Sequence, residues 1–129
     1  MMQRTLLIAI GVLSVGTAIY MWTSTQHWYD NVPGVSATGP LNVHFVKDVA
    51  LAYLASGAAL LWAGLKRDKT AGICGASWLV FHALFHIWIW LHRGLPVDII
   101  AVSNLFGIQF PAFVAVFAAI KLQTRGLQS

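Results

Sequence analysis

The chain has 129 residues, of which 58% are hydrophobic and 9% are charged, and its mean hydropathy is +0.72. Soluble globular proteins average about 25% charged residues, so this composition argues against a water-soluble domain. The formal net charge is +4, but the Lys and Arg residues lie beside apolar segments, where they orient helices, and nucleic acid is excluded as a partner. The length indicates one integral membrane domain that covers residues 1–129.

The first apolar stretch covers residues 5–22, close to the roughly 20 residues that cross a bilayer. Arg4 followed by an apolar run is also typical of a secretory signal, and we interpret the segment as a membrane anchor. The connection that follows reads "TSTQHWYDNVPGVSATGPL". Its Pro-Gly and Gly-Pro pairs break regular structure, so we predict an ordered outer loop of about 20 residues and no helix there.

Three further apolar stretches cover residues 42–65, 71–92 and 98–122. Together with the first stretch they predict an all-α fold, a four-helix transmembrane bundle. Lys47 and Arg93 fall on one side of this bundle, and a larger basic group falls on the other side: Arg4, Lys66, Arg67, Lys69, Lys121 and Arg125. The positive-inside rule then predicts that both termini are cytoplasmic.

Aromatic residues near the ends of the apolar stretches predict the membrane interfaces, because amphipathic rings prefer the headgroup region. We expect interface anchors at Trp22, Trp28, Tyr29, Trp62, Trp88 and Trp90. Of these, Trp62 marks the inner interface and the others mark the outer interface. The lipid bilayer is therefore the first partner that the sequence predicts.

Small and polar residues share one helical face in each of the last three stretches, and small residues let helix backbones approach closely in lipid. The faces comprise His44, Asp48, Ala52, Ala55, Ala59 and Ala63, then Ala71, Gly75, Trp78, His82 and His86, then Ser103, Gly107, Pro111 and Ala115. We expect the polar members of the first two faces to point into the bundle. Pro111 also frees a carbonyl that must find another partner.

The same residues gather at one depth. With a rise of 1.5 Å per residue, most of the polar positions lie about 9 to 17 Å below the outer surface. The predicted buried cluster comprises His44, Asp48, His82 and His86, with Asn104, Gln109 and Lys47 around it. Lys47 is one step off the face of its neighbours, and its long stem can reach the outer interface.

The spacing of the histidines predicts a transition-metal site. His82 and His86 stand one helical turn apart on one face, which suits chelation. His44 and Asp48 have the same spacing and would complete a set of imidazole and carboxylate ligands for copper, zinc or iron. Haem b is a variant of this hypothesis, with one histidine from each of two helices as axial ligands. Such a site would serve a larger membrane redox complex.

Motifs for catalysis by the chain itself are missing from the sequence. The histidine motif lacks the Glu of His-Glu-x-x-His, and there is no Gly-x-Ser-x-Gly, phosphate loop or dinucleotide fingerprint. We therefore assign no catalytic residue and leave enzymatic activity open.

Two alternatives explain the same cluster. In the first, the side chains form an inert hydrogen-bond network inside a structural accessory subunit that packs against other membrane subunits or a second copy. In the second, the cluster is a proton or quinone site, with Asp48 and His86 as the relay and Phe85 or Trp88 as ring contacts. The residues alone leave all three hypotheses open.

The run "WYDNVPGVSATGPLNVHFVKDVALAYLASGAALLWAG", followed by "HALFHIW", resembles small bacterial four-span membrane proteins of the DoxX-like superfamily. The likeness is clearest at "TGPLNVHFVKD". It implies a four-helix bundle in the bacterial inner membrane. Some DoxX-like proteins look like partners of quinone-linked oxidoreductases, which implies a role beside a redox enzyme. No catalytic motif of that superfamily maps onto these residues.

Overall fold

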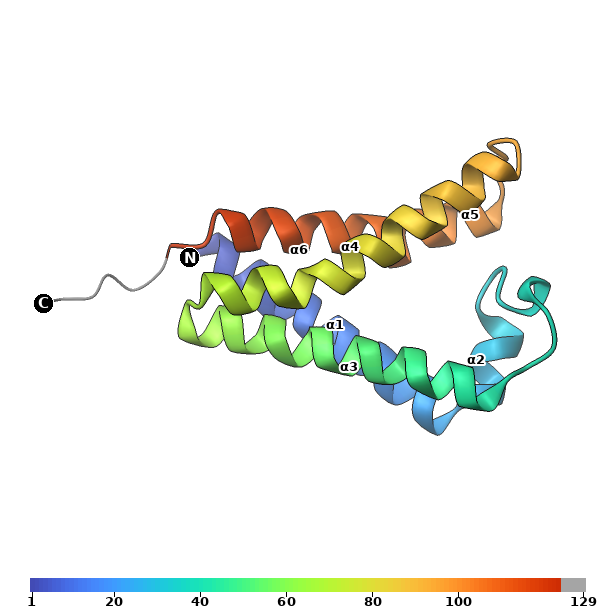
Figure 1. Cartoon of the computed structure of the whole chain (residues 1–129), viewed down its shortest axis with the longest axis horizontal. Helices are drawn as coiled ribbons and strands as arrows, with labels where there is room; N and C mark the ends of the chain where they lie inside the picture. Colours follow the sequence, from blue (N-terminus) through green and yellow to red (C-terminus); the bar gives the residue numbers. More distant parts are fainter. Residues whose placement is uncertain (124–129) are drawn as a thin grey trace, which may run out of the picture.

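The computed structural model describes residues 1–123, and every regular element in that range is helical. Four apolar segments are long enough to cross a membrane: α1 Met2–Thr23, α3 Val43–Lys66, α4 Lys69–His92 and the composite segment Ile99–Ile120. They pack as a bundle (Figure 1), which confirms the predicted all-α four-helix fold of a multi-pass membrane protein. We call the end with the first connection the loop end, and the end with the N-terminus the terminal end.

The basic residues used for the orientation prediction gather at the terminal end. Arg4 donates a hydrogen bond from Nε to the carbonyl oxygen of Gly64 at 2.9 Å, Lys66 is the last residue of α3, and Lys121 follows the last helix. Arg125 lies outside the described residues. The side of the membrane on which this end lies remains a prediction.

Side-chain caps begin three of the four membrane segments, and the cap of the fourth segment is the carboxylate of Asp98, which accepts from the N–H of Ala101 at 2.8 Å. The carboxylate of Asp68 accepts a hydrogen bond from the backbone N–H of Ala71 at 3.0 Å, and the amide of Asn42 accepts one from Phe45 at 3.1 Å. Between α3 and α4, Arg67 adopts the left-handed conformation with φ of 59°. This left-handed residue ends α3 and lets α4 return antiparallel to it.

The first connection contains a helix, so the prediction of a loop without one is wrong. Helix α2 covers Thr25–Asn31, and the 3₁₀ turn η1 covers Ser36–Thr38. The Pro-Gly pair at residues 33 and 34 ends α2. The helix can form before this pair because the residues that precede it include no helix breaker. The hydroxyl of Tyr29 donates to the carbonyl oxygen of Gly39 at 2.7 Å and holds the rest of the connection against α2.

The fourth segment changes its helical pitch just before Pro111. It consists of α5 Ile99–Asn104, the π-helical turn η2 Leu105–Gln109 and α6 Phe110–Ile120. Proline has no N–H to donate to the carbonyl four residues earlier, and the N–H of Phe110 reaches back five residues to the carbonyl oxygen of Leu105. The carbonyl that Pro111 frees is that of Gly107, four residues before it, whereas this bond accepts at Leu105. The partner of the freed carbonyl therefore remains a prediction.

Glycines bring the helix backbones into contact toward the terminal end. A Cβ atom added at Gly57 would lie 2.9 Å from the carbonyl oxygen of Gly11, and one added at Gly64 would lie 3.0 Å from that of Arg4. On the other side of α3, a Cβ atom at Gly75 would lie 3.1 Å from the carbonyl oxygen of Ser56. Any larger residue at these positions would push α1 or α4 away from α3.

The buried face of α3 is not the predicted one in its loop half. Val46, Ala50 and Gly57 are buried, whereas His44 and Asp48 are exposed. The prediction that His44 and Asp48 point into the bundle is therefore wrong for the chain on its own. The physical reason is the close contact of Gly57 with α1, which fixes the rotation of α3 about its axis.

The predicted interface anchors divide into two groups. Three are exposed and three are half-buried: Trp22, Trp62 and Trp88, then Trp28, Tyr29 and Trp90. The indole of Trp90 donates a hydrogen bond to the carbonyl oxygen of Pro96 at 2.9 Å and thereby ties α4 to the following turn. The contact of these rings with lipid headgroups remains a prediction.

Candidate functional site

Two half-buried histidines lie one turn apart on the inner side of α4. The ring centroids of His82 and His86 are 4.6 Å apart, with an angle of 71° between the ring planes. Trp78 stacks on His82 at 4.9 Å, and Tyr53 from α3 meets the same imidazole edge-on at 5.9 Å. Aromatic rings from two helices therefore hold His82 in a fixed orientation.

The two imidazoles have no hydrogen-bond partner in the described part of the chain. The Nδ1 atom of His86 is buried and unpartnered. Among residues 1–123, the imidazoles that make hydrogen bonds belong instead to His27, with Tyr20, and to His92, with the carbonyl oxygen of Trp88. A buried polar atom without a partner is costly in an apolar environment. The histidine pair is therefore a site whose hydrogen-bonding or ligating capacity is unused within the bundle.

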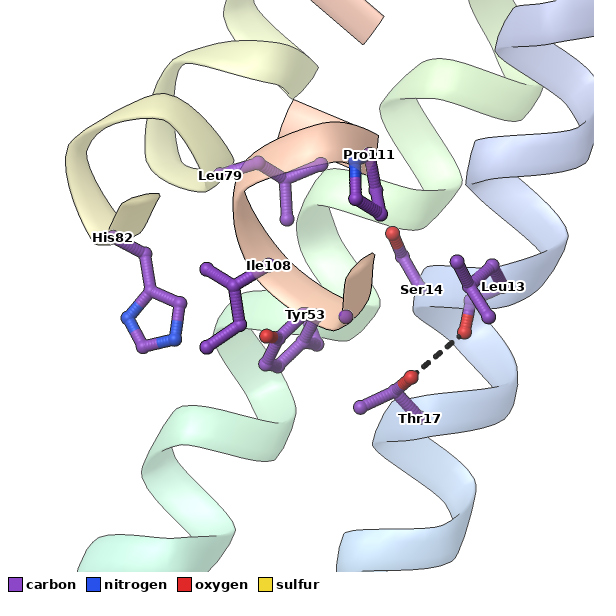
Figure 2. A pocket seen from close by; sticks show the side chains of 9 residues that line it. Leu13, Ser14, Thr17, Tyr53, Leu79, His82, Ile108 and Pro111 are labelled. Atoms are coloured by element: carbon purple, nitrogen blue, oxygen red, sulfur yellow. Dashed lines mark hydrogen bonds between the residues drawn. The ribbon is translucent and has the colours of Figure 1, made fainter. Parts of the chain in front are cut away.

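A small cavity lies beside His82 at the meeting point of all four membrane segments (Figure 2). Its volume is about 20 Å³, which is enough for about one water molecule. Ser14 of α1, Tyr53 of α3 and His82 of α4 supply its polar lining, and Pro111 of α6 closes one side. Thr17, also in the lining, donates its own hydroxyl to the backbone carbonyl of Leu13 at 3.0 Å.

The other predicted ligands form a separate pair on α3. Nε2 of His44 lies 3.3 Å from Oδ2 of Asp48, and the two side chains are 89% and 60% exposed. Within residues 1–123, no group of three or more His, Cys, Asp or Glu side chains is arranged to hold a metal ion. The structure thus divides the predicted cluster into an exposed pair, His44 and Asp48, and a half-buried pair, His82 and His86.

The three residues predicted around the cluster make no hydrogen bond to the histidine pair in the described part of the chain. Lys47 turns toward α1, where its Nζ atom lies 4.9 Å from the centroid of the Trp22 ring. Asn104 is half-buried and Gln109 is buried in the fourth segment. No side-chain hydrogen bond within the described range joins either amide to a histidine ring.

Phe85 and Trp88, the predicted ring contacts of a quinone, lie on an exposed surface, and their contact with a quinone remains a prediction. Phe85 and Trp88 stack at 6.0 Å with 14° between their planes, and both rings are more than half exposed. Phe85 also meets His86 edge-on at 5.9 Å. The relay predicted with them is not assembled, because Asp48 pairs with His44.

Ser14 and Tyr53, which line the cavity with His82, were not among the predicted site residues. The signal for Tyr53 was its place on the face of α3 that also carries Val46, Ala50 and Gly57, at steps of three or four residues. Ser14 occupies the corresponding face of α1 between Gly11 and Ala18, both of which are buried.

The chain matches no family model, no curated protein and no solved structure. The resemblance to DoxX-like proteins therefore remains a prediction.

Proposed function

We propose that this membrane protein binds a transition-metal ion through the imidazoles of His82 and His86. The observation that carries the proposal is the pair itself: two rings 4.6 Å apart, with the buried Nδ1 of His86 unpartnered. Neutral imidazole nitrogen is a good ligand for zinc, copper and iron. A bond to a metal ion would also satisfy a nitrogen that otherwise has no partner in an apolar surrounding.

The remaining ligands would come from outside the pair. A tetrahedral ion with two imidazole ligands has two further positions, which water, a partner subunit or a second copy of the chain can fill. This arrangement supports the hypothesis that the site serves a larger membrane complex. The cavity beside His82 is about 20 Å³, roughly the size of one water molecule, so the interior favours a bare ion over the macrocycle of haem b.

The test is metal analysis of the purified protein with matched histidine variants. The protein is loaded with zinc, copper or iron in separate samples. We expect His82→Ala and His86→Ala each to weaken metal binding at least about tenfold, because even substitution of the partners of metal ligands weakens binding by about that factor. His44→Ala removes an exposed histidine of α3 and should leave binding unchanged.

Two results would contradict the proposal. The first is a wild-type protein that takes up no stoichiometric metal and shows no haem absorption band. The second is an equal loss of metal in His44→Ala and His86→Ala, which would instead support the four-ligand cluster predicted from the sequence.

A structural accessory role is the second candidate, and the fourth segment supports it. Four phenylalanines lie along one side of this segment at steps of four, three and four residues, with 43–66% exposure: Phe106, Phe110, Phe113 and Phe117. Aromatic rings provide large contact areas for a neighbouring helix. Phe113→Ala together with Phe117→Ala should then release a co-purifying subunit, whereas Phe81→Ala, which removes an exposed ring on α4, should not.

A further inference from the structure

An apolar groove runs between α1 and α3 near the loop end and is separate from the histidine pair. Its volume is about 300 Å³. The floor is formed by two small buried residues, Ala18 and Ala50. The walls and the rim are formed by Ile19, Trp22, Thr23, Leu51 and Leu54. The groove exists because the small side chains of Ala18 and Ala50 face each other and leave a hollow between α1 and α3. Larger side chains flank this hollow on both helices.

A single cation stands at the loop end of this groove. Lys47 lies on the same face of α3 as Ala50, Leu51 and Leu54, because these residues follow steps of three and four. Its Nζ atom lies 4.9 Å from the centroid of the Trp22 ring, which also lines the groove. In the part of the chain that the structure describes, the ion pairs are His44–Asp48 and Arg93–Asp98, so no carboxylate neutralises Lys47.

We propose that this groove binds one acyl chain of a glycerophospholipid whose phosphate contacts Lys47. The lining of the groove extends about 6 Å along α3, from Ala50 to Leu54, and Lys47 lies about one helical turn beyond it. This length fits within the roughly 15 Å of hydrocarbon in one leaflet. The ammonium lies at the end of the groove that is nearer the loop end, where a headgroup would stand. Positive charge at that end and apolar walls along the rest match the two parts of a phospholipid.

The dimensions favour an acyl chain over a helix of another subunit. A volume of about 300 Å³ over the roughly 7 Å that the lining residues span corresponds to a cross-section of roughly 40 Å². A helix with its side chains is about 10 Å wide, or roughly 80 Å² in cross-section, so it would rest on the rim without filling the groove. An extended hydrocarbon chain is narrower than a helix and can lie along the floor formed by Ala18 and Ala50.

The test is native mass spectrometry of the detergent-solubilised chain, titrated with phosphatidylglycerol or with diacylglycerol of the same acyl chains. We expect one phosphatidylglycerol per wild-type chain, bound about fivefold more tightly than diacylglycerol, since one lysine near an anionic headgroup contributes on that scale. Lys47→Met should remove this preference. Lys66→Met is the matched control, because Lys66 also lies over a tryptophan, Trp62, at 5.6 Å, but at the other end of α3.

A second variant tests the groove and not the charge. Ile19 is 56% exposed, so Ile19→Trp can fill the groove without changing the core and should abolish binding of both lipids. Equal binding of the two lipids by wild type, an equal effect of Lys47→Met and Lys66→Met, or unchanged binding by Ile19→Trp would each overturn the proposal. A dimer that Ile19→Trp dissociates would identify a second copy as the occupant and would overturn it as well.

Discussion

The terminal half and the loop half of this bundle are packed by different means. Toward the terminal end, Gly57 of α3 contacts the backbone of α1, and Gly75 of α4 contacts the backbone of α3. Toward the loop end, Gly16 and Gly107 have no atom within 4 Å of an added Cβ, so these glycines bring no helices together. Close backbone approach therefore belongs to one half of the molecule.

The features that can bind ligands lie in the middle of the bundle and in its loop half. These are the unpartnered nitrogen of His86, the small cavity beside His82 and the groove that ends at Lys47. Association of helices in lipid depends on van der Waals packing. Where glycine makes that packing tight there is no space for a ligand, and where aromatic rings and alanines replace glycine, small spaces remain.

The largest effect on stability is expected from a substitution that disrupts the close helix packing of the terminal half. In Gly57→Ala, the new Cβ would lie 2.8 Å from Cγ2 of Val15 and 2.9 Å from the carbonyl oxygen of Gly11. We expect a loss of about 2 kcal/mol in the free energy of unfolding, since overpacking a close contact typically costs about 1–3 kcal/mol. The measurement is unfolding by a denaturing detergent in mixed micelles.

Gly16→Ala is the matched control, because it makes the same chemical change on α1 where a Cβ meets nothing within 4 Å. Equal stability of the Gly57→Ala and Gly16→Ala proteins would mean that the two halves do not differ in packing as the structure indicates.

His86→Leu tests the unsatisfied nitrogen of the loop half. In the metal-free protein we expect this variant to be more stable than wild type by about 1 kcal/mol, because leaving a buried polar atom unpaired costs about 1–3 kcal/mol. When wild type is saturated with metal, we expect it to be more stable than His86→Leu. His92→Leu is the control, since that imidazole is exposed and already bonded to the carbonyl oxygen of Trp88. A metal-free His86→Leu protein that is less stable than wild type would argue that the nitrogen has a partner.

The fold could be predicted from the sequence because membrane spans are local features. Twenty apolar residues cross a bilayer whatever the neighbouring helices do, and the four stretches therefore coincide with the four apolar helices. The partial burial of His82 and His86 could also be predicted from α4 alone, because the small residues Ala71 and Gly75 indicate that this face of the helix packs against its neighbours.

The rotation of α3 could not be predicted in this way. Two of its faces carry small residues: one includes Ala52, Ala55 and Ala59, and the other includes Ala50 and Gly57. The choice between them depends on the contact of Gly57 with Gly11, a residue of another helix 46 positions earlier. The pattern of residues along one helix contains no information about that contact. Because the wrong face of α3 was chosen, the predicted position of His44 and Asp48 was wrong.

Tyr53→Phe tests whether the cavity of the middle region is hydrated. The hydroxyl of Tyr53 lines a cavity of about one water molecule together with Ser14 and His82. We expect its removal to lower the free energy of unfolding by about 1 kcal/mol, the typical net value of one hydrogen bond. Tyr20→Phe, which removes a hydroxyl bonded to His27 on the surface at 2.6 Å, should have a smaller effect because solvent replaces it. A stabilised Tyr53→Phe protein would mean that the cavity is dry.

The smallest effect is expected at Asp98, which precedes the fourth segment at the loop end. The backbone N–H of Ala101, together with the guanidinium of Arg93, holds the pKa of the Asp98 carboxyl below its ordinary value of 3.8. A carboxyl whose pKa is lower in the folded state stabilises the protein above the unfolded pKa, and this stabilisation is lost as the pH falls through the folded pKa. We therefore expect wild type to lose thermal stability below about pH 4 more steeply than Asp98→Asn.

The difference in acid sensitivity between wild type and Asp98→Asn should be measurable although it is small, because the chain has only four acidic residues and the variant removes one of them. The asparagine amide oxygen can still accept the Ala101 N–H as a helix cap, so at neutral pH the variant loses only the exposed ion pair with Arg93, a small contribution. Parallel loss of thermal stability in wild type and Asp98→Asn between about pH 5 and pH 3 would show that the cap is uncharged or unformed in the folded protein. The start of the fourth segment would then be held by apolar contacts alone, such as that of Ile100, whose side chain lies 2.8 Å from a Cβ added at Gly34.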